Sequence, residues 1–150
     1  MPQSYACLHY HFVFSTKGRA PLLVAELRPR LFEYVGGVLR AHGGCLLAAG
    51  GVEDHVHLLA GLSRETAVAE ALRLVKANSS KWLHDTGQVD PSFAWQAGYG
   101  AFTVSHSQLD VVRRYLAGQE EHHRRQTFQD EFRELLRRHG IEFDERYLWD

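Results

Sequence analysis

Residues 45–62 read CLLAAGGVEDHVHLLAGL, and their pattern predicts the centre of the fold. Two short apolar runs, 45–49 and 55–62, flank the connection 50–54, which has the length and the glycines of a hairpin loop. Apolar runs of roughly four to eight residues between such turn residues are typical of buried strands. The stretch therefore predicts two neighbouring antiparallel strands.

The flanking segments extend this hairpin into a longer alternation of strands and helices. Apolar residues alternate in part over one segment before it, and they recur at helical spacing in several others. Ser107, with Asp110 three residues later, resembles the capping box that begins a helix. The sequence predicts strands over 6–14, 45–49, 55–62 and 99–104, and helices over 27–41, 66–84, 107–123 and 127–139.

The first six of these elements follow the order βαββαβ. This is the order of a ferredoxin-like α+β sandwich, in which helices cover one face of an antiparallel sheet. With 150 residues and no linker, the chain is expected to form a single domain, with residues 127–150 as a C-terminal helical extension.

Composition places the chain among globular proteins of the cytoplasm. No apolar run approaches the roughly 20 residues of a membrane span, and residues 1–5 lack the pattern of a signal peptide. Cys7 and Cys45 are expected to be reduced thiols in the core. The net charge of −1 does not indicate a nucleic-acid binder, but phosphates respond to local fields, so charge alone decides nothing.

The strongest local indication of a functional site is the pair His55 and His57. Side chains alternate along a strand, so both imidazoles project from one face while Val56 projects from the other. Their spacing of about 6–7 Å allows both to bind one divalent metal. Two imidazoles form an incomplete metal site, and a polar face that meets solvent is the alternative interpretation.

Tyr115 and Gln119 are four residues apart on the third predicted helix and share one face. The core-facing stripe of that helix runs instead through Leu109, Val112 and Leu116. This leaves Tyr115 and Gln119 beside it, where they could face a cleft. In the alternative, Tyr115 packs on the sheet and Gln119 is exposed.

Taken together, these features resemble a known family. A His-hydrophobic-His strand followed about sixty residues later by a helical Tyr-xxx-Gln is similar to the single-tyrosine HUH transposases of the insertion-sequence 200/605 type and their relatives associated with repetitive extragenic palindromes. Four ordered segments carry the resemblance: YHFVFSTKGR at 10–19, GVEDHVHLL at 51–59, WQAGYGAFTVS at 95–105 and VRRYLAGQEEHH at 112–123.

The resemblance implies a DNA transposase that cleaves and rejoins single-stranded DNA at hairpin-marked ends. It implies that His55, His57 and Gln119 bind Mg or Mn, and that Tyr115 forms a 5′-phosphotyrosine bond. It further implies a homodimer in which the helix with Tyr115 serves the partner's metal site.

Basic and aromatic side chains near these segments are expected to contact DNA. Lysines and arginines contact phosphates and exposed tryptophans stack on bases in single-strand binders. The expected residues are Lys17, Arg19, Lys76, Lys81, Trp82 and Trp95.

Two rival functions stay open at this point. One is a non-catalytic ferredoxin-like module that binds nucleic acid. The other is a metal-dependent phosphodiesterase that uses water, in which Tyr115 is incidental.

Overall fold

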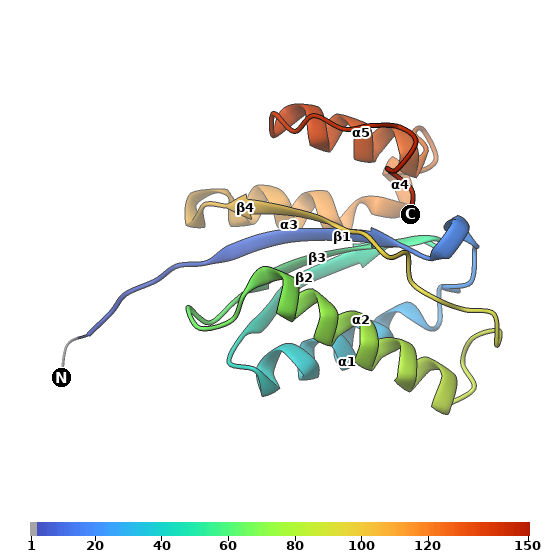
Figure 1. Ribbon diagram of the computed structural model, residues 1–150, viewed down its shortest axis with the longest axis horizontal. Coiled ribbons are helices and arrows are strands. Elements are labelled where there is room, and N and C mark those ends of the chain that lie inside the picture. Colours follow the sequence, from blue (N-terminus) through green and yellow to red (C-terminus); the bar gives the residue numbers. More distant parts are fainter. Residues whose placement is uncertain (1–2) are drawn as a thin grey trace.

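Four antiparallel strands form the central sheet of the computed structural model, which describes residues 3–150 (Figure 1). Their order in the sheet is β2-β3-β1-β4, and β3 and β1 are the two central strands. This topology confirms the predicted ferredoxin-like class. The strands are β1 (His9–Ser15), β2 (Cys45–Gly51), β3 (His55–Gly61) and β4 (Gly100–Val104).

The two predicted histidines, His55 and His57, lie near the start of β3, one of the two central strands. His55 lies opposite Ser15 of β1, and His57 lies opposite Val13. On the other side of β3, His57 lies opposite Gly50 of β2. Directly paired residues of antiparallel strands project to the same face, so Gly50 leaves room beside His57.

The first face of the sheet is covered by α1 (Arg28–Ala41) and α2 (Val68–Asp85), seen below the strands in Figure 1. Val56 projects into this larger core, as the alternation along β3 predicts. The core is built from side chains that recur at strand and helix spacing, among them Phe12, Phe14, Leu31, Val35, Leu58, Leu72 and Val75.

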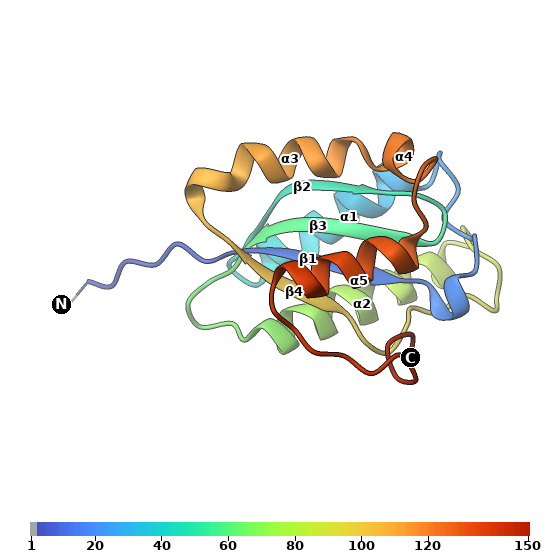
Figure 2. The ribbon, with the colours of Figure 1, turned by 90° about the horizontal axis from the view of Figure 1, so that it is seen from above.

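The second face is covered as well, by α3 (Leu109–Ala117), the short α4 (Gln119–His122) and α5 (Phe128–Arg138). Figure 2 shows α3 running beside β2 and α5 lying across the other strands. Leu116 of α3 packs with Leu59, while Phe132 of α5 packs with Val13. Helices thus cover both faces, whereas the sequence predicted cover on one.

The predicted helix over 107–123 is wrong in two details. Gly118 separates α3 from α4, so the helix does not continue through it. Ser107 lies in the short 3₁₀ turn η2 (His106–Gln108) and does not cap α3, because its hydroxyl contacts that of Ser105 at 2.6 Å. The turn after β1, η1 (Lys17–Arg19), holds Gly18 at a φ of +65° and confirms the predicted break there.

Three expectations about burial are wrong. Cys7 and Cys45 are free thiols but are exposed, outside the core. Trp95 is only 9% exposed, because it packs edge-on against Phe14 and donates its indole N–H to Ser79 Oγ at 3.0 Å.

Within residues 3–150, no helix has the length and apolarity needed to cross a membrane.

Candidate metal centre and nucleophile

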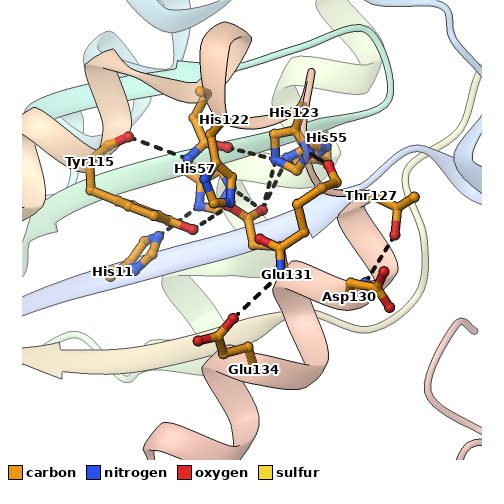
Figure 3. A network of polar contacts seen from close by, with 12 residues as sticks. His11, His55, His57, Tyr115, His122, His123, Thr127, Asp130, Glu131 and Glu134 are labelled. Carbon is orange, nitrogen blue, oxygen red and sulfur yellow. Dashed lines mark hydrogen bonds and ion pairs between the residues drawn. The ribbon is translucent and has the colours of Figure 1, made fainter.

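His55 and His57 lie between the sheet and the helices of the second face (Figure 3). Both side chains are completely buried. The interpretation of the pair as a polar face open to solvent is therefore wrong. A buried imidazole needs a partner for each ring nitrogen, and those partners define the site.

Asp54 orients the His55 ring. Its Oδ1 lies 2.7 Å from His55 Nδ1, so that nitrogen donates and Nε2 points into the centre. Within residues 3–150, His55 Nε2 makes no hydrogen bond. Burial lowers the pKa of His55, but the hydrogen bond to Asp54 and the carboxylate of Glu131 outweigh it and leave the pKa above its usual value.

His57 is held by a chain of polar contacts. Its Nδ1 lies 2.8 Å from His11 Nε2, and its Nε2 lies 2.9 Å from Glu131 Oε1. Burial lowers the pKa of His57 to about 4, and burial together with repulsion from His57 lowers that of His11 to about 3. Both rings are therefore neutral at pH 7, the form in which imidazole binds metals.

Tyr115 lies over the histidines of its own chain. Its ring centroid is 5.7 Å from that of His57, and its hydroxyl donates to Glu131 Oε2. Burial and the negative charge of Glu131 raise the pKa of Tyr115 above its usual range.

Gln119, at the start of α4, is also buried. Its side-chain Oε1 lies 2.9 Å from His123 Nε2, and the His123 ring centroid is 4.4 Å from that of His55. The structure thus brings together Tyr115, Gln119 and both histidines, with His123 between Gln119 and His55.

Glu131 of α5 is the central residue that sequence reasoning missed. Its side chain is 2% exposed and contacts four histidines as well as Tyr115. Burial alone would raise the pKa of Glu131, but the imidazoles of His123, His55 and His57 that face its carboxylate hold that pKa well below its usual range. One signal was available, because Glu131 falls on the apolar stripe of α5 that carries Phe128 and Phe132.

The donor set at this centre fits a divalent metal. Ligand atoms of His55, His57, His123 and Glu131 all lie within 4.8 Å of one another. Imidazole nitrogen and carboxylate oxygen are ordinary ligands of divalent transition metals. With Nδ1 donating to Asp54, the neutral His55 ring has its lone pair on the unpartnered Nε2, where it could bind a cation.

Only part of the predicted DNA surface lies near this centre. Lys17 and Arg19 belong to η1, next to Thr16, whose backbone N–H donates to Asp54 O at 2.8 Å. Lys76 instead donates to the backbone oxygens of Gln96 at 2.6 Å and Gly98 at 2.9 Å.

The remaining predicted DNA contacts also have partners within the chain. Lys81 forms an ion pair with Asp85, with 2.5 Å between nitrogen and oxygen, and Trp82 stacks on Tyr34 with ring centroids 4.8 Å apart. Trp95, being buried, presents little surface to a base.

Fold and site together define a ferredoxin-like protein with a histidine-rich potential metal centre facing a tyrosine. Residues 4–119 match the family described as "Transposase IS200 like", and the chain belongs to that family of transposases. The family match ends before α5.

Individual relatives agree with this assignment. The chain is 23% identical over 117 residues to the ISDra2 transposase TnpA of Deinococcus radiodurans, spanning 75% of this chain and 84% of that protein. A solved candidate transposase from Deinococcus radiodurans has the same fold, with a TM-score of 0.61 and 23% identity over 79% of this chain and 96% of its own. A REP-associated tyrosine transposase bound to a REP hairpin superposes with a TM-score of 0.53 and 15% identity, over 77% of this chain and 67% of its own.

Proposed function

We propose that this transposase cleaves and rejoins single-stranded DNA through a covalent bond between Tyr115 and a 5′ phosphate. The observation that carries the proposal is the position of the Tyr115 ring beside His57, at a centre of buried imidazoles. Residues 1–150 would act as one domain in the cytoplasm.

His55, His57 and Gln119 are the proposed ligands of Mg or Mn. Such a cation, when bound, stabilises the negative charge that a phosphodiester gains during attack and orients it. Asp54 fixes the His55 ring with its Nε2 toward the centre, and His123 links Gln119 to the same place. These contacts support the ligand set without a rearrangement of the strand.

The chemistry of Tyr115 is a phosphoryl transfer that conserves bond energy. The phenol oxygen forms a bond to phosphorus, the bond from phosphorus to the 3′ oxygen breaks, and the phenol proton is lost as the 3′ hydroxyl gains one. A 3′ hydroxyl of another strand reverses the step and joins DNA without ATP. Because the pKa of Tyr115 is raised, the phenol needs a nearby cation or base to react at neutral pH.

The proposed substrate is a DNA hairpin with a single-stranded flank. A structural neighbour of this fold was solved with a REP hairpin, which supports this class of DNA. A pocket of about 70 Å³ is lined by Tyr115, Glu131 and Arg138, and the scissile phosphate is proposed to enter there. Lys17 and Arg19 are proposed to hold the backbone at the His55 end, and Lys76 and Lys81 would need to leave their present partners to do so.

A denaturing gel tests this function. Incubation with labelled hairpin DNA and Mn²⁺ should give a covalent protein–DNA band, and chelation of the metal should abolish it. Trypsin cuts after Arg114 and Arg124, so the peptide 115–124 should carry the added nucleotide mass. Binding of DNA without cleavage across several hairpins would instead favour the non-catalytic module.

A mixing experiment decides whether the reaction uses one chain or two. The resemblance implies a homodimer with Tyr115 acting on the partner's metal, whereas the contacts of one chain already place Tyr115 beside its own His57. We therefore expect that a mixture of Tyr115→Phe and His57→Ala variants stays inactive. Recovery of about a quarter to a half of the adduct in the mixture would establish action across the dimer.

A further inference from the structure

We infer that Glu131 is itself a ligand of the metal, through Oε1, and holds the Tyr115 hydroxyl in place through Oε2. The helix α5 then completes the site and joins the nucleophile to the metal through one carboxylate. This inference rests on the proposed function, but it concerns a residue beyond the segment 4–119 that matches the family.

The two oxygens of Glu131 face different groups. Oε1 lies 2.9 Å from His57 Nε2, 3.0 Å from His123 Nε2 and 3.4 Å from His55 Nε2. Oε2 accepts the hydroxyl of Tyr115 (Figure 3). A carboxylate that binds a metal through one oxygen keeps the other free to accept a hydrogen bond, and this division matches the contacts of Glu131.

The partners of Glu131 leave room for a cation beside its carboxylate. Among residues 3–150, the ion pairs of Glu131 are all with histidines, and none is with lysine or arginine. A buried carboxylate is strongly destabilising unless positive charge compensates it. A divalent cation bound among the imidazoles would supply that charge where the carboxylate lies.

The orientation of the His55 ring leads to the same conclusion. With Asp54 accepting from Nδ1, a neutral His55 ring presents the lone pair of Nε2 toward Glu131 Oε1. At 3.4 Å from each other, this nitrogen and this oxygen are close enough for one divalent cation to bind both, since each metal–ligand bond is about 2.0–2.2 Å long. Two histidines with one carboxylate form a common binding site for divalent transition metals with open positions.

The packing of α5 holds Glu131 in this position. Phe128 and Phe132, one on each side of Glu131 along the helix face, pack with Val13 and Phe102 of the sheet. Thr127 caps the start of α5, since its hydroxyl accepts from the backbone N–H of Asp130 at 3.2 Å. The carboxylate is therefore preorganised, as a ligand must be for tight binding.

Limited proteolysis of the unmodified protein tests the inference without any substitution. Arg137 and Arg138 lie exposed on α5, and Arg64 lies exposed in the loop after β3. If Glu131 binds the metal, saturating Mn²⁺ should slow tryptic cleavage at Arg137 and Arg138 about tenfold. Cleavage at Arg64 should not change. Unchanged or faster cleavage of α5 with Mn²⁺ would overturn the inference, because a metal bound through Glu131 must stabilise α5.

Calorimetry with Mn²⁺ gives the second measurement. Glu131→Gln keeps the size of the side chain but loses the charge, and it should weaken Mn²⁺ binding by about 10–100-fold. Glu134→Gln is the matched control, since Glu134 lies on the same helix but pairs with Arg138; its affinity should equal that of the unmodified chain. Circular dichroism without metal checks folding, and Glu131→Asp, which keeps the charge but shortens the reach, should give an intermediate affinity.

These measurements separate the inference from the proposed function. Normal Mn²⁺ affinity in Glu131→Gln, with the DNA adduct still formed, would overturn the role of Glu131 and leave the function standing. Mn²⁺ binding that depends on Glu131, with no adduct on any hairpin, would support the ligand and count against the covalent function.

Discussion

Replacing Tyr115 with phenylalanine will abolish the covalent protein–DNA complex, with a loss of at least about a thousandfold in adduct yield. The phenol oxygen is the only atom removed, and in the proposed reaction it is the atom that bonds to phosphorus. The Tyr115 ring would still pack on His11 and His57. The measurement is the denaturing gel with labelled hairpin DNA and Mn²⁺, with Mn²⁺ affinity measured on the same preparation.

The control for this prediction is Tyr147→Phe, because Tyr147 is 66% exposed and lies far along the chain from the centre. It should form the adduct as the unmodified chain does. Tyr115→Phe should also stay folded, since losing its hydrogen bond to the Glu131 carboxylate costs about 1.5–3 kcal/mol. Cleavage of DNA that persists in Tyr115→Phe without an adduct would reject the tyrosine mechanism and favour a phosphodiesterase that uses water.

The sheet and the direction of the histidines were predictable from sequence because both follow from local periodicity. Alternation along a strand fixes which side chains share a face, so His55 and His57 had to lie opposite to Val56. The glycines at 50 and 51 predicted the hairpin, but both belong to β2 and pair with β3, so the predicted loop over 50–54 begins two residues too early. The order of the strands then followed from the small number of ways in which βαββαβ chains pair.

The cover over the second face was not predictable in the same way. Whether His55 meets solvent depends on where α5 packs, and α5 begins more than seventy residues later. Its apolar stripe predicted that it would pack on something, but not on which face. The contact of Glu131 with His57 is therefore a consequence of tertiary packing, and an acid on an apolar stripe was its only local sign.

The predicted DNA contacts show the same limit for charged side chains. A lysine in sequence reads as a solvated cation, yet the ammonium group of Lys76 is bound by backbone oxygens of the segment before β4. That segment also buries Trp95 against the larger core. The two backbone oxygens that bind Lys76 belong to residues distant from it in the sequence. Only the folded chain therefore distinguishes a structural lysine from one that is free to bind phosphate.

Gly50→Ala should damage both stability and activity, because α3 crosses β2 directly over this residue. A Cβ at Gly50 would overlap the backbone carbonyl of Leu116, with its carbonyl carbon only 2.8 Å away. Backbone atoms cannot rotate aside as a side chain can, so the helix must shift. We expect a loss of about 1–3 kcal/mol in the free energy of unfolding, measured by urea denaturation.

The larger effect of Gly50→Ala is expected on the reaction. Leu116 is the neighbour of Tyr115, and Gly50 lies opposite His57 in the sheet, so a shift of α3 moves the phenol away from the histidines. A displacement of about 1 Å at a reacting group can cost about a hundredfold in rate, and adduct yield should fall by that factor under conditions where the variant is folded.

Gly37→Ala is the matched control, because a Cβ there meets only the end of the Arg40 side chain at 3.7 Å. It should stabilise α1 by up to about 1 kcal/mol and leave the adduct unchanged. Full adduct yield in folded Gly50→Ala would show that Tyr115 does not depend on this close approach for its position.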